Sequence, residues 1–213
     1  MKNFEIGNVF VNLDLFGGNE FERGDCAHIV KKHFENPIIQ SPEYSSFGLA
    51  VKSLWSKPTS QIFLHMEDDW IFNTSIMPAD IDNLFDSKTK QVALHFGRYH
   101  RYLPGRFHWA KKSYFGLDIF PDLKRPVFAT SPSFIESNFA RQCAALMNPN
   151  LDPEKQMSNG LVQELSDYTS KYRCRLLKKK HGLDHVTDIG RLWREVNGIE
   201  KKFRNGSSVW EEK

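Results

Sequence analysis

Hydrophobic and polar positions switch between strand-like and helix-like spacing over the first seventy residues. Residues 8–14 alternate and are rich in Val and Phe, and residues 37–40 and 61–66 form two further strand-like runs. Residues 25–34 predict a short helix between the first two strands. A second helix is expected after Ser46, a residue type that caps helices. The apolar positions of that helix, at helical spacing, are Phe47, Ala50, Val51, Leu54 and Trp55. This alternation of strands and helices predicts an α/β fold with a largely parallel sheet.

The pattern is less regular in the second half of the chain. Strands are expected over residues 91–96 and 126–130, separated by an irregular, basic and aromatic segment at 97–125. Ser133 and Glu136 have the spacing of a capping box, in which each side chain satisfies a backbone amide at a helix start. The sequence therefore predicts a helix that begins at Ser133.

Two further helices are expected towards the carboxyl end. The first begins at Pro153 after the capping residue Asp152, and the second follows Asp188 and ends at Gly198. The buried side of the second helix is expected to consist of Ile189, Leu192, Trp193 and Val196. Residues 199–213 are polar and predict a loose tail.

The composition is that of a globular protein. The 213 residues suit one compact domain or two small ones, and 40% hydrophobic with 26% charged residues is an ordinary globular profile. A formal net charge of +3 is too balanced to indicate a nucleic-acid partner. Three widely spaced cysteines favour a reduced, cytoplasmic compartment. No run approaches the roughly 18 apolar residues that would cross a bilayer.

The strongest chemical signal is a run of three carboxylates, Glu67, Asp68 and Asp69, between an apolar strand and Trp70. Adjacent negative charges repel one another and are costly to bury, and a hard divalent cation with oxygen ligands would relieve that repulsion. Ligand sites in open α/β sheets also lie at the carboxyl ends of strands. These arguments favour a metal site. The alternative is a solvated turn in which the carboxylates satisfy local backbone groups.

Residues 45–52 and 62–70 resemble the nucleotide-sugar-dependent glycosyltransferases of GT-A fold, in particular small bacterial and phage-type members like those of family 2. In that family an acidic motif at a strand end holds Mn²⁺ or Mg²⁺ against the donor diphosphate. Residues 127–134 and 148–156 resemble the acceptor half of the family, and residues 185–193 resemble a carboxy-terminal motif of some members.

The resemblance covers roughly residues 8–195 and implies a fold. That fold is a three-layer α/β/α sandwich with a mostly parallel central sheet. We expect a single domain over residues 1–198, with the donor half at about 1–90 and the acceptor half at about 91–198. Residues 199–213 would follow as a polar tail.

The resemblance also implies roles for individual side chains. Mn²⁺ or Mg²⁺ would be held by Asp69, Glu67 and His185. The nucleotide-sugar donor would be bound by Asp14, Ser46, Lys52, Glu67, Asp68 and Arg191. The acceptor would be bound by Tyr99, Tyr102 and Trp109, since aromatic faces suit sugar rings.

A carboxylate at a helix start would be the general base, with Glu154 ahead of Asp152. Such a base takes the proton of the attacking hydroxyl group. The alternative is that both carboxylates only stabilise the positive end of a helix.

The function expected from these residues is metal-dependent transfer of a sugar from a nucleotide sugar to a glycan or related acceptor, with inversion. Two alternatives remain open. Carboxylate clusters also build the two-metal sites of phosphoesterases and nucleases. Basic and aromatic residues at 98–115 would equally suit a non-catalytic module that binds glycan or RNA.

Overall fold

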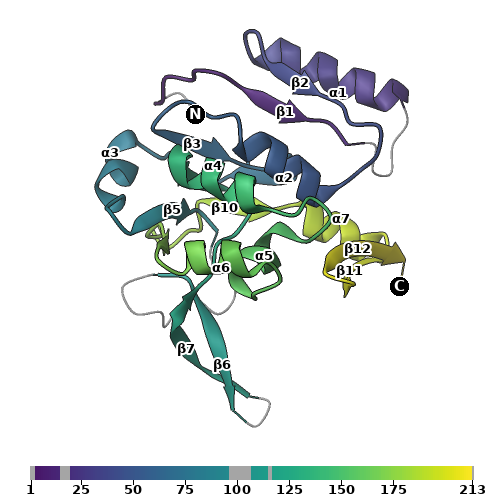
Figure 1. Cartoon of the computed structure of the whole chain (residues 1–213). Coiled ribbons are helices and arrows are strands. Elements are labelled where there is room, and N and C mark those ends of the chain that lie inside the picture. Colours follow the sequence, from purple (N-terminus) through teal and green to yellow (C-terminus); the bar gives the residue numbers. More distant parts are fainter. Residues whose placement is uncertain (1–2, 15–19, 96–106, 115–116, 213) are drawn as a thin grey trace.

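The computed structural model describes residues 3–14, 20–95, 107–114 and 117–212 (Figure 1). The strands are β1 (Phe10–Asn12), β2 (Ile38–Gln40), β3 (Ile62–His65), β4 (Trp70–Phe72), β5 (Thr89–Ala93), β6 (Trp109–Tyr114), β7 (Leu117–Pro126), β8 (Ser133–Glu136), β9 (Arg173–Leu176), β10 (Val186–Asp188), β11 (Ile199–Arg204) and β12 (Ser207–Glu212). The helices are α1 (Glu20–His33), α2 (Phe47–Trp55), α3 (Pro78–Ile81), α4 (Ser137–Leu146), α5 (Pro153–Ser158), α6 (Gln163–Thr169) and α7 (Gly190–Val196), with the 3-10 turn η1 (Asp82–Leu84).

The strands of the described residues form five small sheets rather than one large one. The largest has four strands in the order β3-β8-β5-β9, and β8 runs antiparallel to both of its neighbours. Parallel pairs in this part of the chain are β1 with β2 and β5 with β9, whereas the remaining pairs are antiparallel. The expected α/β/α sandwich of GT-A type with a mostly parallel central sheet is therefore wrong.

Strand β8 breaks the parallel order. Ser133 and Glu136 do not form a capping box. They bound this strand, and Glu136 stands at the N-cap position of α4 without a side-chain capping bond. Phe134 packs into one hydrophobic cluster and Ile135 into the other, so the strand is buried on both faces. Burying two large apolar side chains contributes about 3–6 kcal/mol, which exceeds the roughly 1 kcal/mol of a cap. Tertiary burial therefore overrides the local helix signal.

The four-stranded sheet separates two hydrophobic cores. Helices α2, α4, α5 and α6 cover one face, with Trp55, Phe139 and Met157 among the buried side chains. The other face is covered by α3 and by the antiparallel ribbon of β4 and β10, and this core contains Ile81 and Val186. The ribbon follows directly after the acidic run, so both ends of that run are fixed by buried structure.

Two hairpins replace segments that were expected to be irregular. Strands β6 and β7, which cover much of the segment expected to be irregular, pair as a long hairpin from Trp109 to Pro126 and project from the body of the protein (Figure 1). The strand expected at 126–130 is wrong, because β7 ends at Pro126. Residues 199–212 do not form the expected loose tail, because β11 and β12 pair in register around Asn205 and Gly206.

Several local predictions are confirmed. Strands β1, β2 and β3 and helices α2 and α5 lie where the pattern placed them, and α1 begins earlier than expected, at Glu20. The Ser46 hydroxyl accepts the Leu49 amide at 3.3 Å, and the Asp152 carboxylate accepts the Lys155 amide at 3.1 Å. Both are N-cap bonds within one turn of chain. No helix in the described ranges is long and apolar enough to cross a membrane.

Candidate active site

Glu67 and Asp69 lie in the short turn between β3 and β4. Strand β3, which is half-buried up to the buried His65, ends at that residue. Strand β4 begins at Trp70, whose indole Nε1 donates to Glu67 Oε2 at 3.2 Å. The Glu67 side chain is half-buried. Asp68 between them is exposed.

Asp69 is fixed by the start of helix α7. Its backbone oxygen accepts the amides of Ile189 at 2.9 Å and Gly190 at 3.4 Å. Its Oδ2 accepts from Arg194 Nη1 at 3.0 Å, and Arg194 also contacts both oxygens of Asp188 at 3.4 Å. A Cβ atom at position 190 would overlap Asp69 Oδ2, so glycine is the residue that fits there. Asp69 Oδ1 is buried and has no hydrogen-bond partner among the described residues.

Glu154 lies in the first turn of α5. Its Oε1 accepts two hydrogen bonds from Thr130, one from the amide at 2.8 Å and one from the hydroxyl at 3.0 Å. Both bonds from Thr130 go to the same oxygen, Oε1. Asp152 is buried and caps the helix, and it also accepts from the Ser208 hydroxyl. The structure therefore gives Asp152 a structural role and leaves Glu154 as the candidate base.

Glu67, Asp69 and Glu154, here called the acidic cluster, share one electrostatic environment. The pKa of Glu67 is raised to about 7, first because burial disfavours its charged form and also because Asp69 and Glu154 repel that charge. The Trp70 hydrogen bond and the positive charge of Lys201 act in the opposite direction. The charges of Asp69, in the turn after β3, and of Glu154, on α5, therefore both act on the Glu67 carboxylate.

Lys201 on β11 is a site residue that the sequence reasoning missed, because residues 199–213 were expected to be loose. The hairpin is anchored beside α5, where Gly206 accepts the Asp152 amide at 2.8 Å and the Ser207 hydroxyl donates to Asn150 at 2.6 Å. Lys201 Nζ lies 5.5 Å above the Phe47 ring. The Asn-Gly pair at the turn was the available signal, since this dipeptide favours two-residue hairpins.

The candidate donor-binding residues divide into two groups. Asp14 follows β1, and its carboxylate accepts from Asn12 at 2.8 Å and from Ser45 at 3.4 Å, beside the Ser46 cap of α2. Asp14 and Ser46 therefore lie near each other. Lys52 lies elsewhere, because its ammonium donates to the Met147 carbonyl at 2.6 Å between α2 and α4.

The two carboxy-terminal candidates, His185 and Arg191, have different surroundings. His185 is buried, and its ring nitrogens contact the Thr74 hydroxyl at 2.6 Å and the Lys178 carbonyl at 2.7 Å. Both nitrogens are thus used within the protein, and neither is open to a metal ion. Arg191 is exposed and lies near Asp188, with Nε 3.8 Å from its carboxylate.

The candidate acceptor residues are only partly visible. Tyr99 and Tyr102 lie outside the described residues. Trp109 begins β6 and packs near Phe107, with ring centroids 6.1 Å apart. Its indole nitrogen is buried without a partner in the described part of the chain.

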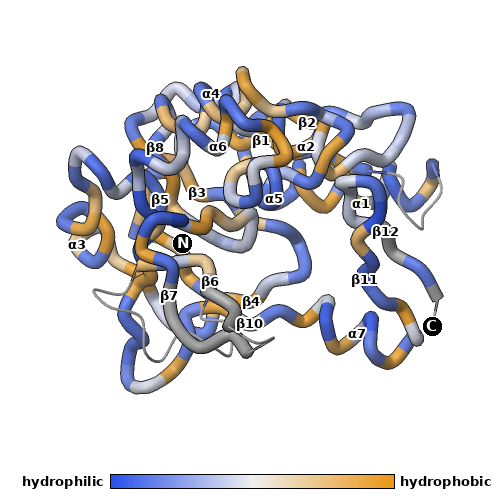
Figure 2. The backbone as a smooth tube through the Cα atoms, turned by 60° about the horizontal axis from the view of Figure 1, so that its bottom comes forward, coloured by the Kyte–Doolittle hydropathy of each residue, from blue (hydrophilic) through white to orange (hydrophobic). Residues whose placement is uncertain are grey.

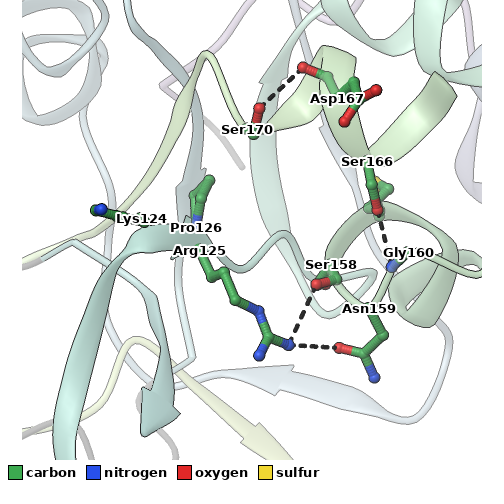
Figure 3. Close-up of a pocket in the computed structure, with 10 residues that line it drawn as sticks. Lys124, Arg125, Pro126, Ser158, Asn159, Gly160, Ser166, Asp167 and Ser170 are labelled. Atoms are coloured by element: carbon green, nitrogen blue, oxygen red, sulfur yellow. Dashed lines mark hydrogen bonds between the residues drawn. The ribbon is translucent and has the colours of Figure 1, made fainter. Parts of the chain in front are cut away.

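A cavity of about 310 Å³ lies between the end of β7 and the α5–α6 connection (Figure 3). Arg125 donates across it to the Ser158 carbonyl and the Asn159 side chain, both at 3.4 Å, and Gly160 donates to Ser166 on the far side. The cavity is lined by polar residues together with Pro126 and Met157, and it adjoins the carboxyl end of α5, whereas Glu154 lies at the amino end. The acidic cluster does not line it.

The described residues supply some of the ligands that a divalent cation would need. No group of three or more His, Cys, Asp or Glu side chains in the described ranges is arranged to hold a metal ion by itself. The carboxylate oxygens of Asp69 and Glu67 are nevertheless hard donors, Asp69 Oδ1 is buried without a partner in the described residues, and the charge of Asp69 acts on Glu67. Mg²⁺ in particular is commonly bound by one or two carboxylates together with substrate phosphates. The pair therefore suits a cation that arrives with a phosphate ligand.

Comparison with protein-family models, with curated proteins and with solved structures gives no significant match for this chain.

Proposed function

We propose that this chain is a metal-dependent glycosyltransferase that moves a sugar from a nucleotide-sugar donor to a hydroxyl group of a glycan or related acceptor. The observation that carries the proposal is the acidic cluster, in which Glu67 and Asp69 after β3 share one electrostatic field with Glu154 at the start of α5. The resemblance of residues 62–70 to the acidic motif of nucleotide-sugar transferases supports the same assignment.

Glu67 and Asp69 would hold Mn²⁺ or Mg²⁺, with the donor diphosphate supplying further oxygen ligands. When bound, the cation supplies positive charge to a leaving diphosphate. Arg194 beside Asp69 and Lys201 beside Glu67 add positive charge from the protein. Asp14 and Ser46 lie at the carboxyl end of β1 and the start of α2, and they are the residues we assign to the nucleoside.

Glu154 is the proposed general base. The acceptor O–H gives its proton to Glu154 Oε2 while the acceptor oxygen forms a bond to the anomeric carbon. The bond from that carbon to the diphosphate oxygen breaks, and the leaving oxygen keeps the electron pair. Because one displacement replaces one bond by another on the opposite side, the anomeric configuration inverts. Thr130 fixes the carboxylate through Oε1 and so keeps Oε2 towards the substrate.

The first test measures binding. Thermal unfolding of the chain is followed with each common nucleoside diphosphate, with and without Mn²⁺, because a ligand of the native state raises the midpoint. We expect one nucleotide to raise the midpoint only when the metal is present. If no nucleotide does so, the donor site is refuted.

The second test separates chemistry from binding. Glu154→Gln keeps an oxygen that accepts both Thr130 bonds but removes the base, so nucleotide binding should persist while sugar transfer falls about 10²–10⁴-fold. Glu164→Gln, at an exposed carboxylate of α6, is the matched control and should keep full transfer. Release of phosphate or nucleotide from diester substrates, without sugar transfer, would instead favour the phosphoesterase alternative.

A further inference from the structure

Gln91 is a fully buried polar side chain in the four-stranded sheet. It lies on β5, between β8 and β9, and its exposed fraction is 0%. Figure 2 shows β3, β5 and β8 together within the body of the molecule. An unpaired amide group in a protein interior is costly, so a buried glutamine needs hydrogen-bond partners. The partners of this amide group therefore show which segment of the chain it holds.

The Gln91 side chain holds both backbone groups of Ala129. Its Oε1 accepts from the Ala129 amide at 3.1 Å, and its Nε2 donates to the Ala129 carbonyl at 2.6 Å. The same nitrogen donates to the Ser133 hydroxyl at 2.9 Å. A neighbouring strand would offer Ala129 the same two backbone bonds, and here a side chain supplies them. These bonds fix the orientation of the segment that connects β7 to β8.

The peptide unit between Ala129 and Thr130 links Gln91 to Glu154. A trans peptide is planar, so its C=O and its N–H point in opposite directions. The C=O of this unit accepts from Gln91, and its N–H donates to Glu154 Oε1 at 2.8 Å. Consecutive hydrogen bonds polarise one another, so the bond from Gln91 strengthens the bond to Glu154. We call these groups, from Gln91 through the 129–130 peptide to Glu154, the Gln91 relay.

We propose that Gln91 is a positioning residue for the carboxylate of Glu154. The inference rests on the proposed function, in which Glu154 is the general base. Such a base has to be held in place, because a misplacement of about 1 Å can cost about 10² in rate. The Thr130 amide and hydroxyl both donate to Glu154, and Gln91 fixes the peptide that carries this amide. A glutamine in the interior of the sheet thus sets the direction of a carboxylate on α5.

A second buried glutamine, Gln156 on α5, offers a matched control. Its exposed fraction is also 0%, and it holds the amide and the carbonyl of Asn148 at 2.7 and 2.9 Å. One further bond goes to the Leu151 carbonyl at 3.0 Å. Gln91→Met and Gln156→Met therefore remove the same number of hydrogen bonds from the protein interior. The bonds of the Gln156 side chain in the described part of the chain go to residues 148–151, so only Gln91→Met breaks the relay.

The first measurement is NMR of the ¹⁵N-labelled full chain and needs no substrate. Gln91→Met should move the Thr130 amide proton upfield and speed its exchange with solvent about tenfold, because its hydrogen bond to Glu154 weakens. Gln156→Met should change neither quantity. Glu154→Gln, which keeps an oxygen for Thr130, should move the Nε2 protons of Gln91 upfield and gives a reading that does not require a Gln91 variant to fold. Unmoved Nε2 protons in this variant, or equal changes at Thr130 in the two methionine variants, would overturn the proposal.

The second measurement is sugar transfer, in the assay used for Glu154→Gln. Gln91→Met should lower kcat about 10²-fold and leave Mn²⁺-dependent nucleotide affinity unchanged, because Gln91 acts through Glu154. In a Glu154→Gln background the same substitution should cause no further loss, and a loss that persists there refutes the positioning role. A parent chain that shows the NMR changes but transfers no sugar keeps the relay and refutes the proposed function, so the two failures are distinguishable.

Discussion

The substitution Asp69→Asn tests the acidic cluster most directly, because it removes one charge and preserves shape. The ion pair to Arg194 is partly exposed, with 29% of the Asp69 side chain and 23% of the Arg194 side chain accessible. Partly exposed pairs contribute about 0.5–1 kcal/mol, and the amide oxygen can still accept from the guanidinium. We therefore expect the free energy of unfolding to fall by no more than about 1 kcal/mol.

Function should change far more than stability. The charge that a divalent cation needs is gone, and loss of such electrostatic stabilisation typically costs about 10²–10³ in rate. The variant should unfold near the parent's midpoint and show no Mn²⁺-dependent shift with nucleoside diphosphate. The pKa of Glu67 should also fall, because the charge of Asp69 is one cause of its elevation.

The matched control is Asp82→Asn, which neutralises an exposed carboxylate in η1 away from the cluster. Isothermal titration with Mn²⁺ and nucleotide, together with urea unfolding, compares the parent with the two variants. If Asp69→Asn binds Mn²⁺ and nucleotide as the parent does, the metal assignment is refuted and residues 67–69 form only a solvated turn.

Three further predictions follow from the same contacts. Gly190→Ala places a methyl group against Asp69 and should lower the free energy of unfolding by about 1–3 kcal/mol. Gly24→Ala, in open space on α1, should raise the free energy of unfolding, and urea unfolding measures both effects. Burial lowers the pKa of His65 to about 4, so below about pH 6.5 the unfolded chain binds more protons than the folded chain. The free energy of unfolding should therefore fall by about 3 kcal/mol between about pH 6.5 and about pH 4, and His65→Gln should flatten this dependence of stability on pH. Because Glu67 holds its proton up to about pH 7, Mn²⁺ affinity measured by titration calorimetry should rise as the pH passes that value, and Glu67→Gln should remove the dependence.

Local signals predicted the local parts of the structure. The caps of α2 and α5 are made within a single turn by Ser46 and Asp152, so nearby residues were sufficient to locate them. Strand β8 was not predictable in this way. Its place between β3 and β5 depends on Phe134 and Ile135 meeting two different cores formed by distant segments.

The candidate site was likewise predictable only in those parts that depend on nearby residues. The run of carboxylates identified Glu67 and Asp69, and a helix-start argument identified Glu154, but their mutual proximity depends on the tertiary fold. The helical spacing of the apolar residues on α7 was identified correctly, but these residues were expected to be buried and are exposed. Periodicity shows which residues share a side, whereas the inward direction was decided by the Arg194 ion pairs.

The ion pairs of Arg194 also reduce the repulsion between the negative charges of the acidic cluster. Without a cation, Asp69 is neutralised by Arg194 and Glu67 keeps a proton up to about pH 7. A cation bound to the same two carboxylates would replace both neutralising groups, so donor binding should release a proton from Glu67 and free the guanidinium from Asp69. Arg194 also contacts Asp188, at 3.4 Å, so it stays beside the cluster when that exchange occurs. If the proposed donor binds there, this guanidinium would pair with its phosphate oxygens, which can accept two parallel hydrogen bonds from arginine.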